Sequence, residues 1–415
     1  MGQPVRRLRE HRHLAWAGAA LVTMALVLTA CGSSSPSATS QSTQTTTPPS
    51  TTSTTAPASS APTTPYSPAP PTPATAARRM FAFYYLWWDS AHWHARLGPN
   101  YPYTDTPLPL PANLSGDGCT VTNNYPGNQL TDVASPLWSQ SDYSQILSDV
   151  TLAAHTGLAG FAVSWAGTGL AGQNANSSTF NQRLAMVVKA VHQINAEGIP
   201  FSLWIAYIGS AHIRTLTALD NDMAYLHQTY GTDPAFDRSN SKEGLPTLIL
   251  EGSLKYPQSL LSSFSAQWRS SFYLVGDENW TTWTSDKAAD FDADSYYWSS
   301  QNPTTFKGSF ADVERLAAEV RSSTNPDGTT KRFFAPQTPG YNTVLGGGNS
   351  CVPRLGGQTM QDIYRGNSGS NPDGWTVISW NEIDEGTYIV PLERYGSQSV
   401  DTMSSIIQQA TAGGQ

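Results

Sequence analysis

Charged residues are scarce in this chain, and several common catalytic motifs are missing from it. Asp, Glu, Lys and Arg together make up 13% of the 415 residues, and the formal net charge is −8. Because no basic cluster occurs beyond the first twelve residues, this acidic balance argues against nucleic acid as a partner. The chain has no GxSxG, P-loop or Rossmann fingerprint and no HExxH. We therefore predict that it binds no cofactor.

Long apolar runs are also missing, apart from one near the N-terminus. The run Leu14–Leu28 follows four arginines and is too short for an ordinary membrane-spanning helix. Residues 1–30 are therefore predicted to be an export signal. The run ends Leu-Thr-Ala-Cys, which resembles a bacterial lipobox, so Cys31 is predicted to carry the lipid. A plain secretory signal with an incidental cysteine is the alternative.

The next segment has little that could form a core. Residues 31–78 consist mainly of Ser, Thr, Pro, Ala and Gln, which cannot bury enough apolar surface to offset chain entropy. We expect a disordered tether there and a folded domain over residues 79–415. The expected location is outside the cytoplasm, with the lipid anchoring the protein to the bacterial cell membrane.

Cysteine is rare, with three residues in the chain. If Cys31 takes a lipid, Cys119 and Cys351 remain, and an oxidising compartment favours a disulfide between them. Two unpaired thiols are the alternative.

Short apolar, aromatic-rich runs recur through the folded part and are typical of buried strands. The eight candidates are Met80–Trp87, Leu158–Trp165, Pro200–Tyr207, Leu245–Glu251, Phe272–Val275, Ser295–Trp298, Arg332–Ala335 and Thr376–Trp380. Helical apolar stripes lie between many of them, near residues 143–154, 180–194 and 313–320. This alternation favours an α/β fold, a (β/α)8 TIM barrel, with a doubly wound open sheet as the alternative. The segment Asp89–Ser139 shows no period, and we expect a long loop insertion after the first strand.

Aromatic and carboxyl side chains gather where the predicted strands end, which in a barrel is the catalytic face. Aromatic rings cover the apolar faces of sugars, and carboxylates and amides bind their hydroxyls. Each ring taken singly could equally be a core residue. The predicted substrate-binding residues at these ends are Tyr84, Tyr85, Trp87, Trp165, Tyr207, Glu251, Trp298 and Asn381, and Glu382 and Glu385 are the predicted catalytic pair.

A metal site is not expected. His92 and His94 have the spacing of a ligand pair, but no third ligand stands at a convincing spacing. His92 or Trp93 lining a sugar subsite is the more plausible role.

Four stretches resemble glycoside hydrolase family 99 and its bacterial relatives. Residues 380–391 read WNEIDEGTYIVP and are similar to the family's C-terminal signature. Residues 82–88 (AFYYLWW) and 157–165 (GLAGFAVSW) resemble its first two strands, and 339–343 (PGYNT) resemble the loop after the seventh strand.

The resemblance implies a (β/α)8 barrel that cleaves α-mannosidic linkages internally, with retention of configuration. It implies that Glu382 acts on the sugar 2-hydroxyl through a 1,2-anhydro intermediate and that Glu385 is the general acid and base. Tyr341 joins the substrate-binding residues on the same grounds. The chain has Ile383-Asp384 where the family has Trp-His, and Val390 where it has Glu, which puts the sugar in doubt.

The main hypothesis is thus a retaining, endo-acting glycoside hydrolase, active on an oligo- or polysaccharide as a monomer. A non-catalytic carbohydrate-binding lipoprotein on the same barrel is the principal alternative. A glycosyltransferase-associated protein is a third, which the export signal disfavours because nucleotide-sugar donors are cytoplasmic.

Overall fold

The structure is a computed structural model that describes residues 76–103, 119, 125–169, 177–208, 214–305 and 308–412. These residues belong to one unit, Tyr66–Gln415. The predicted signal segment, nearly all of the tether and Cys31 lie outside the described residues. Within the described part, no helix combines the length and the apolar character needed to cross a bilayer.

Eight parallel strands close into a barrel, in the order β1-β10-β7-β6-β5-β4-β3-β2. They are β1 (Met80–Tyr85), β2 (Gly160–Trp165), β3 (Ser202–Ile208), β4 (Thr247–Glu251), β5 (Tyr273–Gly276), β6 (Ala293–Ser295), β7 (Arg332–Gln337) and β10 (Gly374–Val377). The first and last strands meet in parallel register, with Met80 opposite Trp375. The predicted (β/α)8 barrel is confirmed, and the open-sheet alternative is wrong.

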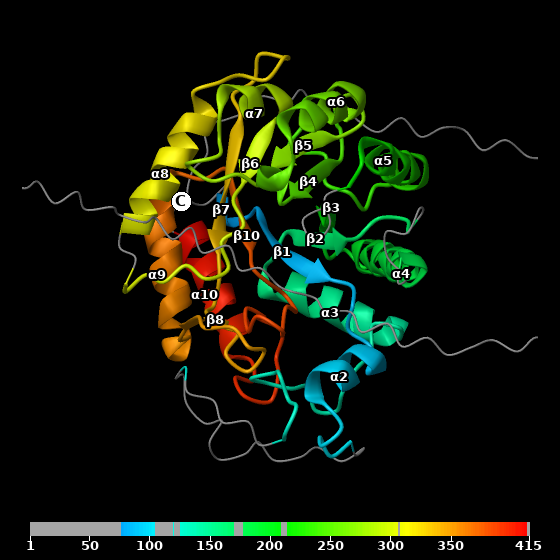
Figure 1. The fold of residues 1–415 in the computed structure, drawn as a ribbon, viewed down its shortest axis with the longest axis vertical. Coiled ribbons are helices and arrows are strands. Elements are labelled where there is room, and N and C mark those ends of the chain that lie inside the picture. Colours follow the sequence, from blue (N-terminus) through cyan, green and yellow to red (C-terminus); the bar gives the residue numbers. More distant parts are fainter. Residues whose placement is uncertain are drawn as a thin grey trace, which may run out of the picture. The chain divides into compact units, whose positions relative to one another are not determined.

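Helices surround the strands (Figure 1). They are α2 (Ser90–Leu97), α3 (Tyr143–Thr156), α4 (Ser177–Ala196), α5 (Leu216–Tyr230), α6 (Gln258–Trp268), α7 (Ser285–Asp290), α8 (Gly308–Arg321), α9 (Gln358–Asn367) and α10 (Gln398–Ala412). The three predicted helical stripes fall in α3, α4 and α8. The Asp142 side chain caps the start of α3 by accepting from the Ser144 N–H, and Gly157 ends it in a left-handed conformation.

The segment Asp89–Ser139 is not without secondary structure, contrary to the sequence-based expectation. It begins with α2, whose N-terminus is capped by the Asp89 carboxylate accepting from the His92 N–H. An eight-residue helix with two histidines and one arginine has too weak an apolar stripe to be recognised from periodicity. In Figure 1, α2 lies on the same side of the barrel strands as β8.

Alternate residues of each strand point into the barrel or toward the helices. On β1, Phe81, Phe83 and Tyr85 belong to the cluster of the barrel interior, whereas Met80, Ala82 and Tyr84 belong to the cluster between strands and helices. The Phe81 ring stacks on Trp204 of β3, with centroids 3.9 Å apart, so the two rings fill the interior. This alternation decides which strand-end side chains reach the active face.

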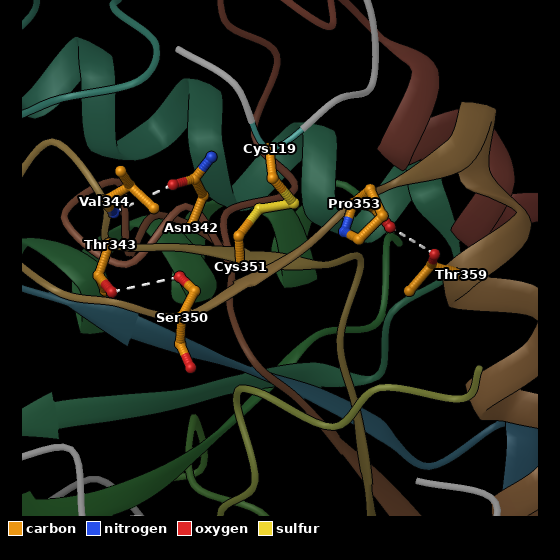
Figure 2. Close-up of a disulfide and its surroundings, with 8 residues drawn as sticks. All are labelled: Cys119, Asn342, Thr343, Val344, Ser350, Cys351, Pro353 and Thr359. Carbon is orange, nitrogen blue, oxygen red and sulfur yellow. Dashed lines mark hydrogen bonds between the residues drawn. A yellow bond between two sulfur atoms is a disulfide. The ribbon is translucent and has the colours of Figure 1, made fainter. Parts of the chain in front are cut away.

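A disulfide joins Cys119 to Cys351, with Cα atoms 5.7 Å apart (Figure 2). Cys351 lies in β9 (Cys351–Val352), which pairs in antiparallel fashion with β8 (Tyr341–Asn342). The predicted disulfide is confirmed. It fastens the insertion after β1 to the hairpin that follows β7.

Candidate active site

The loop after β10 is closed on itself and carries both predicted catalytic glutamates. The Ser379 N–H donates to the Thr387 carbonyl (2.9 Å), and the Ile389 N–H returns to the Ser379 carbonyl (2.9 Å). Within this frame the Glu382 N–H donates to Ser379 Oγ (2.7 Å). Backbone hydrogen bonds therefore fix the positions of Glu382 and Glu385 relative to each other and to the strand end.

Glu382 is buried, with 4% of its surface exposed. Its Oε1 accepts from the Asp384 N–H at 3.1 Å. Burial raises the pKa of Glu382 well above its ordinary value, and the negative charges of Asp384 and Glu385 raise it further, while Arg96 lowers it. Burial and the neighbouring carboxylates therefore oppose ionisation of Glu382, whereas Arg96 and the Asp384 N–H favour its anion.

Glu385 lies on the same loop and has a different environment. Burial raises its pKa to about 7, with a contribution from the Asp384 charge and an opposing hydrogen bond from the Ser299 side chain. Its carbonyl accepts from the Asn342 N–H of β8 at 2.8 Å. Its Oε2 is buried and makes no hydrogen bond to another described residue. A carboxyl group with a pKa near neutrality and one free oxygen suits general acid and base catalysis.

A third carboxyl group, Glu251 at the end of β4, faces the pair. Burial raises its pKa to about 8, with further contributions from the charges of Asp277 and Glu385, whereas Lys255 lowers it. Its Oε2 also has no hydrogen-bond partner among the described residues. Burial therefore raises the pKa of all three carboxyl groups at this end of the barrel.

Aromatic side chains line the same site. The hydroxyls of Tyr85 and Tyr297 lie 2.8 Å apart, and the Tyr85 ring lies 4.4 Å from that of Trp87. Burial and the charges of Glu251, Glu382 and Glu385 raise the pKa of both tyrosines. Tyr341 of β8 is close to the same carboxylates, and burial followed by the Glu385 charge raises its pKa to about 12.

Three predicted substrate-binding residues point the other way. Tyr84 donates to Asp149 of α3 (2.9 Å), Trp165 donates to Asn181 of α4 (2.7 Å), and Tyr207 donates to Asp222 of α5 (2.7 Å). All three are fully buried between strands and helices. The prediction that they contact substrate is wrong, because their strand parity places them on the outer face of the barrel.

Two more predicted residues are used elsewhere. The Asn381 amide accepts from the Tyr85 N–H (2.8 Å) and donates to the Tyr85 carbonyl (2.9 Å), and it is fully buried. It therefore fastens the loop to β1 and has no face left for a sugar. Trp298 packs against Trp280 and Tyr296, with ring centroids 5.4 Å away in both cases, and belongs to the layer between strands and helices, whereas Tyr297 packs against the barrel interior.

The sequence-based reasoning missed Tyr297, Ser299 and Arg96. Tyr297 and Ser299 continue the inward parity of Ser295 beyond the end of β6, so strict alternation along that strand could have found them. Arg96 comes from α2, and nothing in its local sequence indicates where that helix packs. Among the described residues, no group of three His, Cys, Asp or Glu side chains is arranged to hold a metal ion.

Solved structures with a similar (β/α)8 barrel were found by comparison of the folds. The GH99 endo-alpha-mannosidase from Bacteroides thetaiotaomicron is similar over 81% of this chain and 98% of its own, with a TM-score of 0.59 and 16% identity. A second structure of that enzyme, in complex with BIS-TRIS-propane, covers 81% and 99%, with a TM-score of 0.57 and 15% identity. At such identity the likeness shows a GH99-like fold and no more. Comparison with protein-family models and with curated proteins gave no match.

Proposed function

We propose that this chain is a retaining glycoside hydrolase that acts internally on an α-mannosidic or related α-linked polysaccharide. The observation that carries the proposal is the cluster of Glu382, Glu385 and Glu251 beside the hydroxyls of Tyr85 and Tyr297 at the C-terminal end of the barrel. The GH99-like fold and the order of the four resembling stretches support it.

The two glutamates take different parts in the proposed reaction. Glu382 removes the proton from the sugar 2-hydroxyl, and the resulting oxygen attacks C1 while Glu385 protonates the departing glycosidic oxygen. Glu385, now ionised, then takes a proton from water, and that water oxygen attacks C1 and opens the 1,2-anhydro ring. Glu382 returns its proton to the 2-oxygen, so two inversions at C1 leave the configuration unchanged.

The electrostatics of the site couple the two glutamates. The Glu385 charge raises the pKa of Glu382, so ionisation of one carboxyl group disfavours ionisation of the other. The proposed active form has Glu382 ionised and Glu385 protonated. Since the pKa of Glu385 is about 7, activity is expected to fall as pH rises through about 7 and the acid is lost.

The test is a screen of α-mannans and other α-linked envelope glycans with product analysis by mass spectrometry. Glu385→Gln is expected to lower turnover by about 10³-fold while leaving glycan binding measurable. Glu319→Gln, on the outer surface of α8, is the matched control and keeps wild-type turnover. Proton NMR of the first product is expected to show the α anomer. A wild-type protein that binds glycans tightly and cleaves none would favour the non-catalytic binding alternative.

We also propose that the protein works outside the cytoplasm and is held to the membrane by a lipid on Cys31. The support is the lipobox-like sequence and the Ser/Thr/Pro-rich composition of residues 31–78. Cys31→Ala is expected to move the protein from the membrane fraction to the medium. Retention of this variant at the membrane would contradict the anchor.

A further inference from the structure

An ion pair holds the turn between the two glutamates from outside the loop. Asp384 Oδ2 accepts from Arg96 Nη2 at 2.7 Å and lies 3.2 Å from His92 Nε2. Both partners come from α2. A second nitrogen of the guanidinium, Arg96 Nη1, donates to Gln129 Oε1 at 3.0 Å, which fixes the plane in which Arg96 meets the carboxylate. The pair is largely shielded from water, with 24% of Arg96 and 17% of Asp384 exposed.

The helix that carries this cation is firmly attached to the barrel. Its cap, Asp89, accepts from the buried Arg183 at 2.6 Å, and Arg183 also donates to the Leu86 carbonyl at 2.6 Å. Trp88 Nε1 donates to the Asn381 carbonyl at 2.7 Å. The start of α2 is thus joined to the end of β1 and to the glutamate loop, so Arg96 approaches Asp384 from a fixed support.

The effect of Arg96 reaches Glu382 through one residue. The Asp384 N–H donates to Glu382 Oε1, so any shift of Asp384 moves a hydrogen-bond donor of the base. The Asp384 charge also disfavours the Glu382 anion, and Arg96 opposes that effect. Without Arg96, the Asp384 carboxylate would lose most of its compensating positive charge. The Asp384 charge would then favour the protonated form of Glu382 more strongly.

We propose that Arg96, assisted by His92, is a positioning residue for the base of the proposed reaction: by pairing with Asp384 it holds the loop in shape and fixes the N–H that donates to Glu382 Oε1. This inference rests on the proposed function. The titratable groups around Glu382 come from six elements. They are Asp384 and Glu385 on its own loop, Arg96 and His92 on α2, Tyr85 on β1, Glu251 on β4, Tyr297 after β6 and Tyr341 on β8.

The experiment compares pH–rate profiles of Arg96→Met, Arg96→Lys and the double variant Arg96→Met/Asp384→Asn. We expect Arg96→Met to move the optimum to higher pH by about one unit, with kcat lowered more than tenfold and KM changed less than threefold. Lysine, which keeps the charge, restores most of the rate. The double variant, which removes both charges, returns the optimum to the wild-type pH or below it, because the Asp384 charge acts on Glu382 more strongly than that of Arg96.

Arg321→Met is the matched control. Arg321 pairs with Asp373 at 2.9 Å with nearly the same exposure, 23% and 14%, at the opposite end of β10 from the glutamates. It is expected to lower thermal stability without moving the pH optimum. An Arg96→Met profile that matches wild type, with stability alone reduced, would overturn the inference.

A second measurement separates this inference from the proposed function. Difference infrared spectroscopy follows the carbonyl band of protonated Glu382, assigned by its loss in Glu382→Gln, in protein without substrate. We expect this band to persist to a pH about one unit higher in Arg96→Met than in wild type. Equal titration in the two proteins overturns the inference whether or not any glycan is cleaved. A shifted titration in a protein that cleaves nothing supports it and leaves only the proposed function refuted.

Discussion

Tyr84 and Tyr85 are neighbours in the sequence and have opposite surroundings. The Tyr84 hydroxyl donates to Asp149 in the layer between strands and helices, whereas the Tyr85 hydroxyl meets Tyr297 among the carboxyl groups of the proposed site. Both side chains are almost completely buried. The outer face of the barrel uses its polar groups to join strands to helices. On the inner face, carboxylate oxygens such as Glu385 Oε2 have no hydrogen-bond partner in the part of the chain that the structure describes. Burial alone therefore does not distinguish a structural polar group from a functional one.

The sharpest test of this comparison sets Asp149 against Glu385. Burial raises the pKa of both to about 7. Asp149→Asn is expected to keep turnover within about threefold of wild type, whereas Glu385→Gln lowers it by about 10³-fold. A steady-state assay of both variants decides the matter. Equal losses would show that the outer carboxyl group also takes part in the chemistry.

Asp149 is also expected to change how stability depends on pH. Its folded-state pKa of about 7 exceeds the ordinary value of 3.8, so the folded protein binds this proton more tightly than the unfolded chain. Its contribution to stability is therefore complete below about pH 4 and is lost as pH rises through about 7. In Asp149→Asn the free energy of unfolding, measured by urea denaturation, should decline less over this range than in wild type. If the free energy of unfolding of the variant declined with pH as steeply as that of wild type, the raised pKa of Asp149 would be contradicted.

The two tyrosines provide a smaller and matched contrast. Tyr85→Phe removes a hydroxyl from the site, and we expect kcat/KM to fall about tenfold with little change in melting temperature. Tyr84→Phe removes a donor to the buried Asp149, and we expect about 1–3 kcal/mol of destabilisation with turnover within about twofold of wild type. Steady-state kinetics and denaturation measure the turnover and the stability of each variant. If the pattern were reversed, the inner and outer faces would be wrongly assigned.

Little effect on turnover is expected from the disulfide, which belongs to neither face. Cys119→Ser/Cys351→Ser is expected to lower the free energy of unfolding by about 2–5 kcal/mol, because the bridge closes a loop of 232 residues. Turnover at low temperature should stay within about threefold of wild type, since the β8–β9 pairing and the Asn342–Glu385 hydrogen bond do not require the bridge. Cys31→Ser is the control and leaves unfolding unchanged. A large loss of turnover in the folded double variant would assign the bridge a part in holding Glu385.

Much of the fold could be predicted because a buried parallel strand leaves a strong local pattern. All eight barrel strands fall within or beside the predicted runs, and the disulfide followed from the redox chemistry of the expected compartment. The face of each strand-end residue was harder to predict. Three aromatic residues at strand ends, Tyr84, Trp165 and Tyr207, lie in apolar stretches like those of the proposed site. Only their parity relative to the barrel axis separates them from residues such as Tyr85.

The remaining errors come from contacts between distant segments. Arg96 and Asp384 are 288 positions apart in the sequence, and their ion pair depends on how α2 packs against the final loop. Asn381 has the composition of a sugar-binding amide, yet the backbone of Tyr85 occupies both its donor and its acceptor. Neither fact has a local signal, because both depend on closure of the barrel between its first and last strands.

The bridge between Cys119 and Cys351 has a consequence for survival in a protease-rich environment. Peptide cleavage at any single site from residue 120 to residue 350 would leave the two fragments covalently joined. The fragment that carries Glu382 and Glu385 would then stay attached to the one that carries Tyr85 and Arg96. A clipped molecule should migrate as two bands on a gel only after reduction, and before reduction it should keep the mass of the intact chain.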